Sequence, residues 1–135
     1  MDVGHGQLHP RLADDARVIA REGLDARALS PSDLPGPPGA VVCDASFISL
    51  TLLLPHVLGL AAPGAWLVAL VKPQFESTPA EVAKGVVRDA GVRARAVARV
   101  RGCVETAGWR VAGVAPSPIE GGDGNVEFLI GAIRE

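Results

Sequence analysis

The sequence lacks the features that mark disulfide-rich, metal-binding and membrane-spanning proteins. Its two cysteines, Cys43 and Cys103, form no CxxC pair, which argues against a disulfide framework or a metal site, and we expect both to be small core residues. The apolar runs at 50–54 and 65–71 are far shorter than the ~20 residues that cross a bilayer, so neither a transmembrane helix nor a membrane partner is predicted. The first residues have neither the basic nor the apolar part of a secretory signal, which favours a cytoplasmic protein.

Positive charge is also scarce. Thirteen Lys and Arg residues against 15 Asp and Glu residues give a net charge of −2, so the chain has no overall attraction to a nucleic acid. Any RNA contact therefore has to be local or come from another domain. Only Lys72 and Lys84 among the 13 basic residues are lysines. What the chain does have is 48% hydrophobic and 21% charged residues over 135 positions, a composition typical of one folded globular domain.

Short apolar segments alternate with helix-like segments along most of the chain. The earlier apolar segments show no regular alternation of polar and apolar residues, which predicts a parallel sheet that is buried on both faces. The last two are expected to pair antiparallel. The segment 31–39, rich in proline and glycine, is predicted to be a surface loop. The predicted strands are Arg17–Arg21, Ala40–Cys43, Ala65–Val71, Arg110–Ala115 and Phe128–Ile133.

Two long helices are predicted between these strands. Ser49 is a suitable N-cap for the first, which either kinks at Pro55 or begins again there, and which ends by 63–64. The second runs from Arg88 to Ala107, where apolar residues recur every three or four positions. Its opposite edge carries arginines that form either a solvated face, the more ordinary explanation, or a contact with phosphates. These arginines are Arg88, Arg95 and Arg99. Together the elements predict an α/β doubly wound sheet with helices on both faces.

Polar residues stand directly after two of the apolar strands. Asp44 follows the strand at 40–43 and Lys72 follows the strand at 65–71. Because ligands of α/β sheets bind beyond the carboxyl ends of the strands, we expect both side chains to border one crevice. The simpler alternatives are that Asp44 caps the following helix and that Lys72 extends its ammonium into solvent.

Four sequence blocks carry a resemblance to a known family. They are D-V-G-H-G-Q-L at 2–8, D-A-S-F-I-S-L at 44–50, L-A-A-P-G-A-W-L-V-A-L-V-K-P-Q-F-E at 60–76 and P-S-P-I-E-G-G-D-G-N-V-E-F-L at 116–129. In this order and spacing they resemble the TlyA (hemolysin A) family of rRNA 2'-O-methyltransferases, which are relatives of the FtsJ methyltransferase. The resemblance implies a Rossmann-like, class I methyltransferase fold, S-adenosylmethionine as cofactor, and ribosomal RNA or a ribosomal subunit as partner.

The resemblance also implies a catalytic set of Lys, Asp, Lys and Glu around the 2'-hydroxyl of a ribose. Asp44, Lys72 and Glu127 match the last three members, and the first lysine would lie upstream. The hydroxyl must lose its proton as it attacks the methyl group, so Lys72 acts either as a base or as a charge that stabilises the oxygen, with the carboxylates orienting it. The alternative for Glu127 is a surface residue beside a turn. For the cofactor, the resemblance implies Asp2 at the ribose hydroxyls, Asp25 near the adenine, and Asp44.

The family's first strand, its glycine loop and an S4-like RNA-binding domain would precede Asp2. We therefore expect residues 1–135 to be part of a methyltransferase domain that by itself binds cofactor and RNA poorly and is inactive. Unpaired sheet edges would favour a homodimer formed by strand pairing. Two alternative functions are a non-catalytic RNA-binding module and a hemolysin-like protein.

Overall fold

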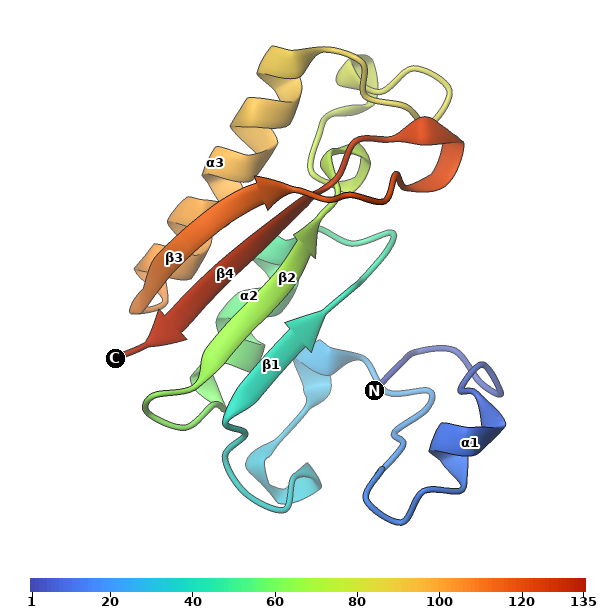
Figure 1. Cartoon of the computed structure of the whole chain (residues 1–135), viewed down its shortest axis with the longest axis vertical. Coiled ribbons are helices and arrows are strands. Elements are labelled where there is room, and N and C mark those ends of the chain that lie inside the picture. Colours follow the sequence, from blue (N-terminus) through green and yellow to red (C-terminus); the bar gives the residue numbers. More distant parts are fainter.

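A four-stranded mixed sheet forms the centre of the computed structural model, which describes all 135 residues (Figure 1). The strands lie in the order β1-β2-β4-β3. β1 and β2 are parallel, whereas β4 is antiparallel to both β2 and β3, which confirms the predicted antiparallel last pair. The strands are β1 (Ala40–Cys43), β2 (Trp66–Val71), β3 (Trp109–Pro116) and β4 (Phe128–Arg134).

Helices α2 (Leu50–Gly59) and α3 (Ala90–Thr106) lie close to their predicted positions. Ser49 caps α2 as expected, because its hydroxyl accepts a hydrogen bond from the backbone N–H of Thr51. Pro55 neither ends nor restarts this helix, which continues through it. Because a proline has no N–H, Pro55 cannot donate the helical hydrogen bond to the carbonyl of Thr51, four residues earlier. That carbonyl instead lies 4.0 Å from the thiol of Cys103 on α3.

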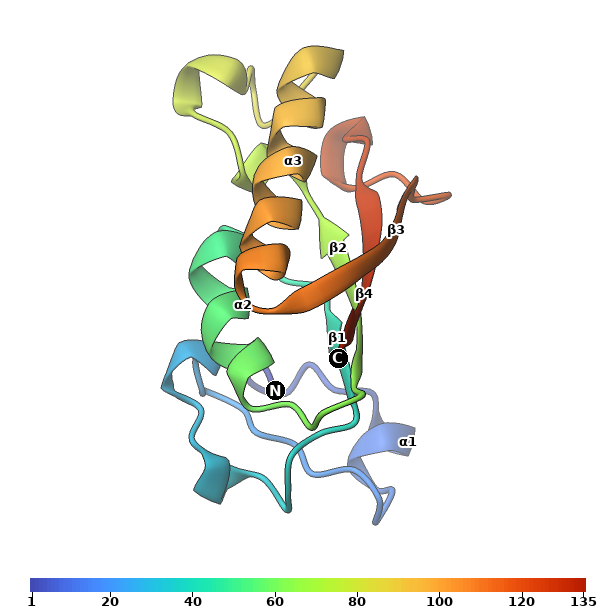
Figure 2. The same ribbon diagram turned by 90° about the vertical axis from the view of Figure 1, so that its left-hand side faces the viewer.

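Both long helices cover the same face of the sheet, as Figure 2 shows, whereas the sequence predicted helices on both faces. The strands alternate accordingly: Leu67 and Ala69 of β2 are buried beneath the helices. On the other face Val42, Trp66 and Val68 are exposed, and Val42 pairs with Val68 across the strands. The hydrophobic core therefore lies between the helical layer and one side of the sheet. Its largest fully buried side chains include Leu50, Leu54, Leu58, Leu67 and Ile130.

The predicted strand at Arg17–Arg21 is wrong. This part of the chain is irregular apart from an isolated parallel bridge between Asp2 and Glu22. A strand needs a neighbour for its backbone groups, and here the N–H of Arg17 bonds instead to the carboxylate of Asp15. The outer edge of β1 is likewise unpaired. The remaining short elements are α1 (Pro10–Ala13), η1 (Ala26–Ala28), η2 (Pro31–Asp33), η3 (Pro73–Phe75), η4 (Pro79–Glu81) and η5 (Gly122–Gly124).

Candidate active site

A pocket of about 780 Å³ opens beyond the carboxyl ends of β1 and β2. Asp44 follows β1, Lys72 follows β2, and Glu127 precedes β4, whose direction is reversed, so that all three residues reach the same end of the sheet. All three line this pocket. The structure therefore brings together the three residues predicted to be catalytic.

Lys72 and Asp44 form an ion pair inside the pocket. The Lys72 Nζ lies 2.6 Å from Asp44 Oδ1 and donates a second hydrogen bond, of 3.0 Å, to the hydroxyl of Ser46. The Lys72 side chain is 13% exposed and that of Asp44 is 72% exposed. Lys72 is thus held at the base of the site and does not extend into solvent, while the carboxylate beside it is open to water.

Glu127 is buried, with 5% of its surface exposed, so it is not a surface residue beside a turn. Its Oε2 accepts a hydrogen bond of 2.7 Å from the amide of Gln74. The backbone of Gly121 packs directly against the same carboxylate, since a Cβ at position 121 would lie 2.0 Å from Oε2. Gln74 was missed in the sequence, although it stands two residues after Lys72 in the same motif.

The V-K-P-Q-F-E motif contains a short 3-10 turn, η3, so that its polar side chains point to different neighbours. Lys72 precedes it and Glu76 follows it. Glu76 is buried and accepts hydrogen bonds from Ser49 Oγ at 2.5 Å and from the backbone N–H of Leu50 at 2.7 Å. Burial raises the pKa of this carboxyl, although the two hydrogen bonds oppose the shift. The sequence pattern assigns a role to Lys72 alone in this motif.

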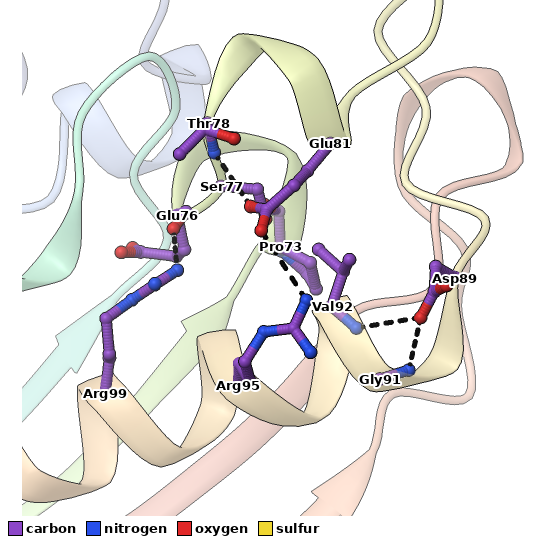
Figure 3. Close-up of polar contacts among 10 residues, drawn as sticks. All are labelled: Pro73, Glu76, Ser77, Thr78, Glu81, Asp89, Gly91, Val92, Arg95 and Arg99. Atoms are coloured by element: carbon purple, nitrogen blue, oxygen red, sulfur yellow. Dashed lines mark hydrogen bonds and ion pairs between the residues drawn. The ribbon is translucent and has the colours of Figure 1, made fainter.

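Arg88, Arg95 and Arg99 are all exposed, as the prediction of a solvated face requires. Two of them, Arg95 and Arg99 of α3, also bind the segment that follows η3 (Figure 3). Arg99 donates to the backbone carbonyl of Glu76, and Arg95 lies 3.5 Å from the Glu81 carboxylate. Arg88 donates to the carbonyl of Ala83. Arg95 and Arg99 thus connect α3 to the segment that follows the turn after Lys72.

Aromatic residues stand at the mouth of the pocket. Phe47 is 90% exposed and has a φ of 63°, a left-handed conformation that is rare for a bulky residue. Its ring packs against that of Phe75 with centroids 5.0 Å apart and planes tilted by 52°. The loop after β1 therefore presents the ring of Phe47 to solvent at the pocket that Lys72 also lines, an arrangement that the sequence pattern did not predict.

A buried asparagine, Asn125, stabilises the glycine-rich side of the pocket by hydrogen bonds. Asn125 Oδ1 accepts a hydrogen bond from the N–H of Val87, and its Nδ2 donates to the carbonyls of Gly85 and Gly122. Asn125 is 2% exposed. These bonds join the loop before α3 to the turn that leads into β4, two residues from Glu127.

The sequence profile of the FtsJ-like methyltransferase family matches residues 1–134. The chain belongs to this family. It is 45% identical over 130 residues to the 16S/23S rRNA (cytidine-2'-O)-methyltransferase TlyA of Mycobacterium tuberculosis, an alignment that covers 96% of this chain and 48% of that protein. The resemblance to the TlyA family is thereby confirmed. The chain spans about half the length of the curated relatives it matches.

Solved structures confirm the class I methyltransferase fold of this FtsJ-like chain. A candidate hemolysin from Lactococcus lactis superposes with a TM-score of 0.95 and 36% identity, covering 99% of this chain and 65% of that one. Magnesium protoporphyrin IX methyltransferase from Synechocystis, solved with bound SAH, superposes with a TM-score of 0.51 and 14% identity, over 84% of this chain and 49% of that one. The second likeness concerns the fold alone.

The family implies S-adenosylmethionine, and the residues present fit this cofactor in part. Four carboxylates and one lysine line the pocket, a balance that suits a ligand with a cationic sulfonium. Asp2 is exposed, and its Oδ1 accepts a hydrogen bond of 2.9 Å from the N–H of Gly4. Its Oδ2 accepts none from the protein and could bind a ligand hydroxyl. Asp25 is less available: it caps η1 and pairs with Arg27, which lowers the pKa of Asp25 to about 2. Neither Asp2 nor Asp25 lines the pocket. The acidic pocket residues are Asp44, Glu120, Asp123 and Glu127.

Proposed function

We propose that this chain is the part of an S-adenosylmethionine-dependent methyltransferase that positions and deprotonates a ribose 2'-hydroxyl of ribosomal RNA. The observation that carries the proposal is the Lys72–Asp44 pair in a pocket that also contains the buried Glu127. The name of the 45% identical relative from Mycobacterium tuberculosis supports the same reaction and substrate. Such a reaction on ribosomal RNA would take place in the cytoplasm.

Lys72 is the group that acts on the attacking oxygen. When bound, the cofactor would supply an electrophilic methyl group. The 2'-oxygen would bond to that carbon as the oxygen loses its proton, while the methyl–sulfur bond breaks and its electron pair stays on the sulfur. An ammonium held by Asp44 and Ser46 is well placed to donate to this oxygen and to stabilise its developing negative charge. Asp44 is open to water and provides the path by which the proton reaches solvent. The geometry therefore favours a charged, stabilising Lys72 over a neutral base.

Glu127 and Phe47 contribute to placing the nucleotide. Gln74 occupies Glu127 Oε2, which leaves Oε1 to accept a hydrogen bond from a ribose hydroxyl. The exposed ring of Phe47 offers a face on which a nucleotide base can stack, an interaction worth about 1–3 kcal/mol per base in single-stranded RNA complexes. Stacking on Phe47 requires an unpaired nucleotide, because a base inside a duplex already stacks on its neighbours.

The test is methyl transfer by Lys72 variants. In a full-length protein that includes the segments expected upstream of Asp2, we expect Lys72→Ala to abolish tritium transfer from labelled S-adenosylmethionine to ribosomal RNA. Cofactor affinity should change less than a few-fold, because Lys72 acts on the nucleophile. Lys72→Arg should also fail, since a guanidinium does not fit a site built for a compact ammonium. Lys84→Ala, which alters the other, exposed lysine, is the matched control. Substantial transfer by Lys72→Ala would refute the assigned role.

Two other functions remain distinguishable from this one. A non-catalytic RNA-binding module would bind ribosomal RNA but show no transfer that depends on Lys72. The relative described as a candidate hemolysin raises a membrane-active function. None of the helices in the structure combines the length and the apolar character needed to cross a bilayer. Transfer assays and release of dye from vesicles separate these alternatives directly.

A further inference from the structure

Glu76 lies outside the pocket, yet it connects the two loops that carry the ion pair. One loop runs from Asp44, after β1, to Ser49 at the start of α2. The other is the turn from Lys72 to Glu76 after β2. Lys72 links these loops on the pocket side through Asp44 and Ser46, and Glu76 links them again at the rear through Ser49 and Leu50.

The rear link is the stronger of the two. Lys72 is 13% exposed but Asp44 is 72% exposed, so water screens the carboxylate end of the ion pair. Exposed ion pairs typically contribute only about 0–1 kcal/mol, because of this screening and because two flexible side chains must be ordered. Glu76 is 9% exposed, and both of its carboxylate oxygens accept hydrogen bonds from the first turn of α2. Hydrogen bonds to a charged group are worth about 1.5–3 kcal/mol each. The ion pair alone therefore does not fix Asp44 relative to Lys72.

Glu76 is itself held in place by the rest of the fold. Its backbone N–H donates to the carbonyl of Pro73 at 3.1 Å, which closes the turn. Its carbonyl accepts a hydrogen bond from Arg99 of α3, as Figure 3 shows. Glu76 is thus the point at which the β2 turn, α2 and α3 meet.

We propose that Glu76 is a positioning residue that fixes Lys72 against Asp44 by tying the turn after β2 to the start of α2. The catalytic meaning of this role rests on the proposed methyl transfer. The structural role stands without it, because it concerns only the order of the Lys72 side chain.

The presence of only two lysines makes that order measurable. In protein labelled with ¹³C and ¹⁵N lysine, NMR relaxation at the lysine ε-carbons reports on Lys72 and Lys84 separately, and Lys84→Arg assigns the signals. We expect Glu76→Ala to make the Lys72 ε-carbon about as mobile as that of Lys84. Glu76→Gln should restore the order, because its amide can accept from Leu50 and donate to Ser49 Oγ.

A neighbouring glutamate provides the matched control. Glu81 lies in the same loop and bonds to the N–H of Thr78 and to Arg95 (Figure 3). Neither of these partners belongs to α2. Glu81→Ala should leave the Lys72 signal unchanged. If Glu76→Ala does not fold, Ser49→Ala removes one of the same two hydrogen bonds and should give a smaller increase in mobility. An unchanged Lys72 signal in a folded Glu76→Ala or Ser49→Ala protein would overturn the proposal.

Kinetics then separate positioning from general loss of structure. In the full-length protein, we expect Glu76→Ala to reduce kcat about 10- to 100-fold with KM for the cofactor within about twofold, since small displacements of a catalytic group have effects of this size. An equal fall in kcat in Glu81→Ala would show a general structural effect and contradict the proposal. A mobile Lys72 in Glu76→Ala, together with no transfer by the unmodified full-length protein, would refute the proposed function and leave the positioning role supported.

Discussion

Replacing Asn125 with alanine should lower the free energy of unfolding by about 3 kcal/mol. The side chain makes three hydrogen bonds, to Val87, Gly85 and Gly122, and a net contribution of about 1 kcal/mol each gives this sum. Val87 is 1% exposed, so its N–H would be left buried without an acceptor, which adds to the loss. Domains of this size are stable by only about 5–15 kcal/mol, so the change is large enough to measure with confidence.

Urea unfolding followed by circular dichroism would measure this effect. Asn125→Asp tests the same contacts more specifically than alanine does. Its carboxylate can still accept from Val87, but it places an oxygen against the carbonyls of Gly85 and Gly122. We therefore expect the free energy of unfolding to fall by at least as much. Asp123→Asn is the control, because this exposed residue has a φ of 58°, which asparagine tolerates well, and its change should stay within about 0.5 kcal/mol. A loss below about 1 kcal/mol in Asn125→Ala would refute the reasoning.

Two further predictions concern the carboxylates of the site. Gly121→Ala should reduce methyl transfer while the protein still folds, because the added Cβ would lie 2.0 Å from Glu127 Oε2 and must displace that carboxylate. Transfer assays paired with thermal melts would measure the loss of activity and the retained fold. Full activity would count against a role for Glu127. Burial raises the pKa of Glu76, so the folded protein binds a proton at Glu76 more readily than the unfolded chain does. Lowering the pH through that pKa should therefore raise the free energy of unfolding relative to that of Glu76→Gln. Urea midpoints for both proteins at pH 7 and pH 5 would check the sign, and a relative loss at pH 5 would contradict it.

The sequence predicted those elements whose stability is local or set by apolar patterning. The helix at Ala90–Thr106 has a three-to-four spacing of apolar residues and an Asp89 cap, and it formed within two residues of its expected start. The strand at Trp66–Val71 is a continuous apolar run and formed almost as expected. The segment Arg17–Arg21 has a similar apolar character, but it found no neighbouring strand. Strand formation depends on a partner elsewhere in the chain, which a local pattern does not reveal.

The candidate site was predictable where a residue follows a strand directly. Asp44 and Lys72 could be paired from the rule that parallel strands end at one edge, and they lie 2.6 Å apart. Gln74 and Glu76 could not be placed in this way, because their roles depend on the 3-10 turn that directs one toward Glu127 and the other toward Ser49. Polar side chains that become buried in such turns look like ordinary surface residues in the sequence.

The charge of the pocket is compatible with the proposed reaction on RNA, although the chain has a net charge of −2. Four carboxylates line the pocket and would repel phosphates, so the backbone of the RNA is expected to stay outside it. Ribose hydroxyls donate hydrogen bonds and the sulfonium is cationic, so both are favoured by the same carboxylates. Lys72, the one positive charge among the lining residues, is held by Asp44 and Ser46 at the point where the attacking oxygen needs it. In the proposed reaction, the pocket therefore selects the sugar and the methyl donor, and attraction to the phosphates has to come from surfaces beyond it.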